Sequence, residues 1–270
     1  MDQFLQLFEY RFFINAIIGT LLTSITAGFI GTYIVSRKIV FISDGITHAS
    51  FGGIGIAYFL GLNPFTGALL FGIGTALGIE WAQKRTNIRE DSAIAVLWSL
   101  GMAVGIIFVY LTPGYTPNLM SFLFGNILSI TSTDLILMGT LSFIVTVSFI
   151  VFYRPILYSA FDPEFAKALG LPVSFIRYSL MVVIASTVVI SIKVSGIILV
   201  MSIFTIPQII ANIFTKNFGL MIPLSILFAF IGVSGGLVVS YFIDLPSGAT
   251  IIITLVIFWL ILKGVHKFFR

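Results

Sequence analysis

The sequence predicts an all-α protein, a bundle of helices that crosses a lipid bilayer many times. Of its 270 residues, 59% are hydrophobic and 9% are charged, whereas a soluble domain has about 25% charged residues. The mean hydropathy is +1.15, and several apolar runs approach the roughly 20 residues that a helix needs to cross the hydrocarbon core. So few charges cannot cover a water-facing surface. We therefore expect a multi-pass protein of the cytoplasmic membrane, with its exterior in contact with lipid.

Nine apolar runs are candidate membrane spans. The first is too long for the core of a signal peptide and is expected to be retained as a span. Two runs nearly merge at residues 193–195, so a count of eight spans stays open. The nine runs are residues 12–35, 39–60, 64–82, 93–111, 135–153, 175–192, 194–214, 220–242 and 247–263. No separate soluble domain or repeat is visible, so residues 1–270 are predicted to form a single membrane domain.

The basic residues give this map an orientation. With the N-terminus outside, all of the 14 Lys and Arg residues except Arg11 and Lys193 lie in segments on the inner side. Because inner loops of membrane proteins are enriched in Lys and Arg, the sequence predicts an N-out/C-in topology. The net charge of +4 then reflects this topology, and we expect no nucleic-acid partner.

Two segments between the predicted spans stand out. Residues 112–133 lie outside on this map, and their apolar part, residues 118–130, is too short to span, so we expect a re-entrant or interfacial helix there. The other segment is cytoplasmic. In it Asp162 can cap a short helix, Pro163 suits its first position and Gly170 can end it.

Asp44 and His48 are the ionisable pair that lies well inside an apolar run. They are four residues apart, so they share one face of a helix. His48 lies ten residues beyond Lys38, or about 15 Å along a helix, which is near the middle of a core about 30 Å thick. Because a carboxylate there costs at least about 2.5–3.5 kcal/mol, such a pair usually faces a protein interior or a water-filled path. Carboxylate and imidazole suit a divalent transition metal.

A structural alternative stays open for this pair, because Asp44 and His48 can simply hydrogen-bond each other. Two ligands per chain are few for a tight site, although a dimer could bring two pairs together. The neighbouring Gly52, Gly53 and Gly55 suit close helix packing, which we favour, or a flexible point beside the path. His266, near the C-terminus, is expected to be a solvated tail residue.

Residue types that the chain lacks exclude several functions. Without Cys there can be no disulfide, thiolate metal site or cysteine nucleophile. The sequence also has no Gly-rich phosphate-binding loop ending in Gly-Lys-Ser/Thr. If transport is driven by ATP, another polypeptide must therefore supply the ATPase.

The residue patterns resemble the permease family of zinc, manganese and iron ABC importers. The resemblance extends over nearly the whole chain. Each matching segment alone is weak evidence for the family, but the segments together are specific for it. The segments are residues 43–49, 90–94, 161–170, 195–200 with Ile206–Pro207, and 244–250.

This resemblance implies a transport subunit rather than an enzyme, with no permanently bound cofactor. It implies a homodimer with a translocation path between the subunits, a cytoplasmic ATPase dimer and an extracytoplasmic metal-binding receptor. It places the intramembrane metal residues on Asp44 and His48, and it makes the helix at residues 162–170 the docking element for the ATPase. The residues expected to couple to the ATPase are Asp162, Pro163, Glu164, Ala166, Leu169 and Gly170.

Two other functions are weaker alternatives. A secondary transporter could use Asp44 and His48 as a proton or ion relay, but it would not need an ATPase docking helix. An intramembrane metalloprotease would need further ligands and a base, such as a His-Glu-x-x-His motif, and the chain has a single His within its predicted spans.

Overall fold

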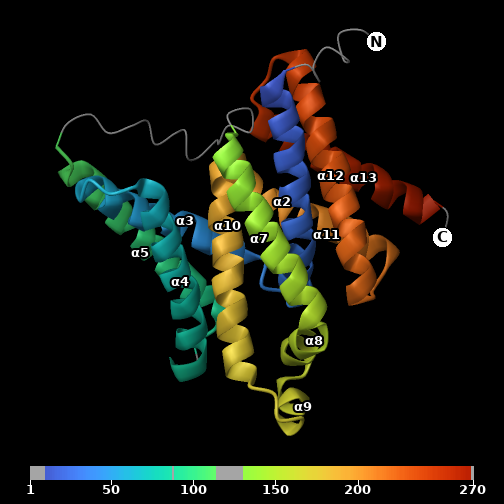
Figure 1. The fold of residues 1–270 in the computed structure, drawn as a ribbon. Helices are drawn as coiled ribbons and strands as arrows, with labels where there is room; N and C mark the ends of the chain where they lie inside the picture. Colours follow the sequence, from blue (N-terminus) through green and yellow to red (C-terminus); the bar gives the residue numbers. More distant parts are fainter. Residues whose placement is uncertain (1–9, 87, 114–129, 269–270) are drawn as a thin grey trace. The chain divides into compact units, whose positions relative to one another are not determined.

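The computed structural model describes residues 10–86, 88–113 and 130–268. Within these ranges the regular structure is helical and contains no strand, which confirms the predicted fold class (Figure 1). The predicted outer helix at residues 118–130 lies almost entirely outside the described residues. The helices are α2 (Arg11–Ser36), α3 (Phe41–Phe59), α4 (Pro64–Thr86), α5 (Glu90–Leu111), α7 (Ser132–Val151), α8 (Tyr153–Phe161), α9 (Pro163–Ala168), α10 (Val173–Ile203), α11 (Ile206–Phe214), α12 (Phe218–Ile243) and α13 (Ser247–Phe268).

Eight stretches of helix in the described residues are long and apolar enough to cross a membrane. The ninth predicted span corresponds to α3, which is not among these eight. Helix α3 has 19 residues but is less apolar, because Gly, Ser, Thr, Asp44 and His48 interrupt its hydrophobic residues. An N-out/C-in topology needs an odd number of crossings, so it requires α3 to cross as well. That orientation stays a prediction.

The chain forms two compact units, each made of segments that are discontinuous in sequence. The α3 unit contains α3, α4, α5, α8, α9 and α10 as far as Ile190. The α12 unit contains α2, most of α7, α10 from Ser191 onward, α11, α12 and α13. The single membrane domain predicted for residues 1–270 stays a prediction.

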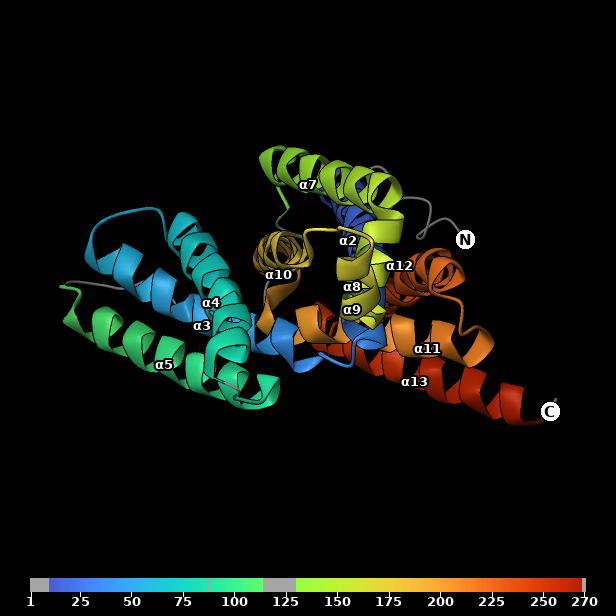
Figure 2. The ribbon, with the colours of Figure 1, turned by 90° about the horizontal axis from the view of Figure 1, so that it is seen from below.

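In the α3 unit, α3 packs against both α4 and α5 (Figures 1 and 2). Glycines make these contacts close. A Cβ on Gly53 would collide with the backbone oxygen of Gly67 on α4, and one on Gly52 would lie 2.9 Å from the carbonyl oxygen of Gly101 on α5. Small residues let helix backbones approach in a membrane. The composition of α3 therefore fits a helix that is covered by other helices more than by lipid, and the expected packing role of these glycines is confirmed.

We expect Gly53→Ala to lower the melting temperature of the purified full-length chain. The added Cβ meets backbone atoms of Gly67, which cannot rotate away, and overpacking of this kind costs about 1–3 kcal/mol. The matched control is Gly74→Ala on α4, where an added Cβ has no atom within 4 Å and the gain in helix propensity is about 1 kcal/mol. Equal melting temperatures for the two variants would contradict this account of the α3 packing.

In the α12 unit, α12 packs against α2, α11 and α13, and Figure 2 shows α11 running alongside α13. The sequence predicted a boundary at residues 193–195. The structure has a non-helical residue just beyond it, Gly196 with φ 74° and ψ 166°, a conformation that glycine adopts because it lacks a Cβ. Pro207 lies in the first turn of α11, where its missing N–H has no helical partner to lose. His266 lies half-buried in the last turn of α13, with its ring 5.7 Å from that of Phe214, and its solvation stays a prediction.

Candidate functional site

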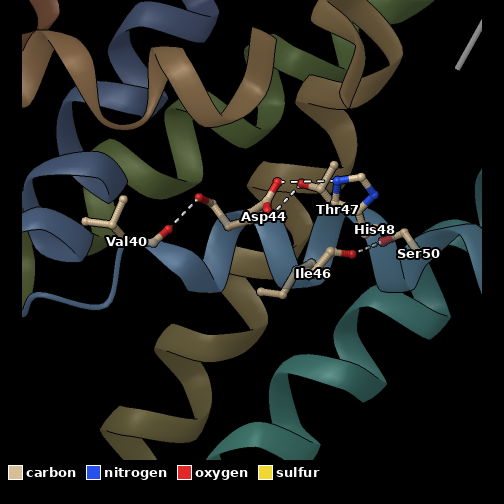
Figure 3. A network of polar contacts seen from close by, with 7 residues as sticks. Val40, Asp44, Ile46, Thr47, His48 and Ser50 are labelled. Atoms are coloured by element: carbon tan, nitrogen blue, oxygen red, sulfur yellow. Dashed lines mark hydrogen bonds and ion pairs between the residues drawn. The ribbon is translucent and has the colours of Figure 1, made fainter. Parts of the chain in front are cut away.

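The first turns of α3 carry Asp44 and His48 on one face of the helix (Figure 3). The neighbouring hydroxyls are occupied within the helix. Ser43, Thr47 and Ser50 each donate to a backbone carbonyl one turn earlier, at 3.0, 2.6 and 2.7 Å. Since these hydroxyls already have acceptors, they do not compete for the carboxylate or the imidazole. The pair is thus left available on this face of α3.

The two side chains point toward each other without a close hydrogen bond. Nε2 of His48 lies 3.5 Å from Oδ1 of Asp44, beyond the usual 2.7–3.2 Å for an N–H···O bond. A metal ion bonded to both atoms would lie about 2.1 Å from each of them. Because the two atoms are 3.5 Å apart, the ligand–metal–ligand angle would be roughly 110°, close to tetrahedral. The spacing therefore suits an ion held between the two atoms at least as well as a direct bond between them.

Trp98 on α5 holds the imidazole ring of His48 in place. The two rings are stacked, with centroids 4.6 Å apart and planes 14° from parallel. One turn earlier on α5, Ile94 occupies the space that a Cβ on Gly45 would need. Helix α5 therefore contacts α3 at His48 itself and at Gly45, the residue after Asp44. The sequence analysis missed Trp98, because nothing local indicates which face of α5 meets α3.

The site is partly open and offers few ligands. The side chains of Asp44 and His48 are 15% and 23% exposed, and Nδ1 of His48 is buried with no hydrogen-bond partner among the described residues. No group of three or more His, Asp or Glu that could hold a metal occurs in the described part of the chain. A pocket of about 500 Å³ between α3, α4 and α5 does not include the pair. A metal ion at this pair would therefore have two side-chain ligands from one chain.

A second ionisable pair inside the apolar helices was missed by the sequence analysis. Glu80 on α4 and Arg177 on α10 form an ion pair, with Nε of Arg177 3.1 Å from Oε1 of Glu80. Their side chains are 3% and 23% exposed, and Gln83 donates to Glu90 nearby on α4 and α5. The sequence signal is the single acidic residue Glu80 within the span at residues 64–82. Its ion-pair partner Arg177 belongs to a distant segment.

Helix α9 has the local structure that the sequence predicts. The side chain of Asp162 accepts a hydrogen bond from Phe165 N at 2.9 Å, and Pro163 begins the helix. Gly170, with φ 76°, donates to Lys167 O at 2.9 Å while Leu171 N donates to Ala166 O at 3.0 Å. These bonds form a Schellman motif. A short helix is thus fixed at both ends.

Helix α9 and its C-cap expose two large apolar side chains beside charged ones. Ala166 is buried, and it anchors the helix to its own unit. Phe165 and Leu169, four residues apart and hence on one face, are 47% and 53% exposed, and Glu164 is also exposed. Large apolar side chains exposed together are typical of a protein-binding surface.

Comparisons with known proteins cover nearly the whole chain. The sequence profile of the ABC 3 transport family matches residues 9–265. The manganese transport system membrane protein MntC of Halalkalibacterium halodurans is 35% identical over 248 residues, which cover 92% of this chain and 85% of that protein. The manganese import system permease protein ScaB of Streptococcus gordonii is 29% identical over 262 residues, which cover 97% of this chain and 94% of that protein.

A solved structure agrees with these matches. PsaBC from Streptococcus pneumoniae, determined in complex with Fab, superposes with a TM-score of 0.84 at 31% identity, covering 97% of this chain and 94% of that chain. The match of the family profile over 9–265 includes all five segments on which the sequence resemblance was based, and the resemblance is confirmed. The chain is a multi-pass membrane component of a transport system rather than an enzyme, and it belongs to the ABC 3 transport family.

Proposed function

We propose that this chain is the permease subunit of an ABC importer for divalent metal ions, with Mn²⁺ as the first candidate ion. The observation that carries the proposal is the Asp44–His48 pair on α3, with its 3.5 Å separation and the ring of His48 oriented by Trp98. A carboxylate and an imidazole are ligands that suit Mn²⁺, Zn²⁺ or Fe²⁺. Relatives named as manganese transport proteins support the choice of Mn²⁺.

The small number of ligands fits transport better than storage. An ion in a permeation path must bind well enough to enter and weakly enough to leave. Two ligands from each chain, on a helix that is covered by α4 and α5, provide such a site, and a homodimer would bring two pairs to one path. The metal is then the cargo of the protein, and no resident cofactor is required.

Energy has to come from a separate chain in this proposal, because the sequence has no phosphate-binding loop. We assign α9 and its flanking residues as the docking element for a cytoplasmic ATPase dimer. The support is the short helix itself, capped at both ends, with Phe165 and Leu169 exposed. An extracytoplasmic receptor would deliver the ion to the opposite side.

The test is reconstitution of the chain in lipid vesicles with its proposed ATPase and receptor partners, followed by uptake of radioactive manganese. We expect uptake to need both ATP and the ATPase. Leu169→Asp should reduce ATP-driven uptake about tenfold or more, because it removes a large exposed apolar contact and adds a charge. The matched control is Ala168→Asp, the exposed neighbour on α9, which should transport better than Leu169→Asp.

Two results would contradict the proposal in different ways. Equal uptake without ATP would indicate a secondary transporter that uses Asp44 and His48 as a relay. Wild-type uptake by Leu169→Asp would mean that α9 does not dock the ATPase, while the metal permease assignment would stand.

A further inference from the structure

A pocket of about 390 Å³ lies where α7 ends, α8 turns and α10 begins. All the residues that line it belong to the α3 unit. Its walls are apolar, with large side chains such as Phe152, Ile156 and Phe175. Ser148 and Ser179 are the polar side chains in the wall. Its chemistry therefore favours a hydrocarbon ligand over a polar solute or an ion.

The position of this pocket relative to the membrane spans indicates where that hydrocarbon comes from. The apolar span of α7 ends at Val151 and that of α10 begins at Val173, so the pocket opens at one boundary of the spans. It extends along α10 to Val183. The eleven residues of α10 from Val173 to Val183 correspond to about 15 Å of helix, half of a hydrocarbon core about 30 Å thick. The pocket therefore reaches from the headgroup level to about the middle of the bilayer, which is the length of one leaflet.

Two exposed basic residues lie close in sequence to wall residues of the pocket. Arg154 adjoins the wall residue Pro155 on α8 and is exposed, and no ion-pair partner for it occurs among the described residues. Lys167 on the nearby helix α9 is also exposed. Lys and Arg at this level attract anionic lipid headgroups, and a guanidinium can hold a phosphate through two parallel hydrogen bonds.

From these observations we infer that the pocket is a binding site for one anionic phospholipid. An acyl chain occupies the apolar pocket, and the phosphate is bound by Arg154. A second copy of the chain is a less suitable occupant, because a two-fold interface pairs each patch with itself and would bring two unpaired Arg154 side chains together. A water-soluble partner cannot fill the pocket either, because Val183 lies deep within the span of α10. The bound lipid would lie beside α9 and so contact the segment proposed to dock the ATPase.

The experiment is a lipid titration of the purified full-length chain, followed by native mass spectrometry. Phosphatidylglycerol is the anionic probe and phosphatidylcholine is the neutral one. We expect phosphatidylglycerol to saturate at about one molecule per chain and to bind about fivefold more tightly than phosphatidylcholine, which corresponds to one Lys or Arg at the membrane surface. Arg154→Gln should remove this fivefold preference, and Ser179→Phe, which fills the pocket, should abolish binding of both lipids.

The matched controls are Arg85→Gln, at an exposed basic residue in the last turn of α4, and Ile150→Phe, at an exposed residue of α7 outside the pocket wall. Both should bind lipid as the wild type does. An unchanged preference in Arg154→Gln would overturn the headgroup assignment, and this exposed substitution leaves the core intact. Lipid retained by folded Ser179→Phe at wild-type affinity would overturn the pocket assignment.

Discussion

Asp44→Asn is expected to reduce manganese uptake by roughly 100-fold while the amount of folded protein in the membrane stays at the wild-type level. The carboxylate offsets the cost of moving a divalent cation through a low-dielectric path, and a charge at the bilayer centre costs about 2.5–3.5 kcal/mol when it is not offset. Asn has nearly the same size and keeps an acceptor oxygen, so it removes the charge with little change in packing. The Asp44 side chain is 15% exposed, so it does not fill a closed core.

His48→Ala should also reduce uptake strongly, since it removes the nitrogen ligand that favours transition metals over Mg²⁺ and Ca²⁺. The control is Ser50→Ala on the same helix, where the lost hydroxyl donates only to Ile46 O, and we expect normal uptake. Uptake and protein level are both measured in a strain that lacks its own manganese importers. If the pair were purely structural, either substitution would strand a polar partner and lower the protein level. Uptake that falls only in proportion to protein level would refute the metal-site assignment.

The local sequence was sufficient for the elements that depend on local chemistry. Helix α9 is the clearest case, because Asp162, Pro163 and Gly170 each act through backbone groups within a few residues. The spacing of Asp44 and His48 likewise follows from the helical period alone. Such features need no knowledge of which helices are neighbours.

Features that depend on the pairing of helices were not predictable from one sequence. Trp98 stacks on His48 because α3 and α5 meet at glycine faces, and several faces of α5 are equally apolar. The low hydropathy of α3 has the same origin, since a helix covered by α4 and α5 can carry Gly, Ser and Thr. Glu80 has its partner Arg177 on a distant helix, so from sequence alone it was only an acidic residue near the end of a span.

The Glu80–Arg177 pair gives the second large expected effect. We expect Glu80→Gln to destabilise the folded chain by about 3–5 kcal/mol, as is usual when one partner of a buried ion pair is removed. The substitution leaves Arg177 without its carboxylate, and Arg37 and Lys84 also lie within electrostatic range of Glu80. The charge of Arg177, whose side chain is 23% exposed, then remains in a mostly buried place. The readout is the melting temperature of the purified full-length chain, together with its level in the membrane.

The double variant Glu80→Leu/Arg177→Met tests why Glu80→Gln is destabilising. It distinguishes the cost of leaving Arg177 charged and unpaired from the loss of the contact between the two side chains. Replacing both members of a buried pair with apolar residues is often neutral or stabilising, and Oε2 of Glu80 already lacks a hydrogen-bond partner. The double variant should therefore melt at a temperature well above that of Glu80→Gln.

Arg89→Gln is the matched control, because it breaks the Arg89–Asp91 pair, whose side chains are 83% and 55% exposed. Exposed pairs contribute about 0–1 kcal/mol, so Arg89→Gln should melt close to the wild type. If Glu80→Gln is no less stable than Arg89→Gln, the pair between α4 and α10 does not stabilise the α3 unit, and the close approach of α3, α4 and α5 through their glycines must hold it together instead.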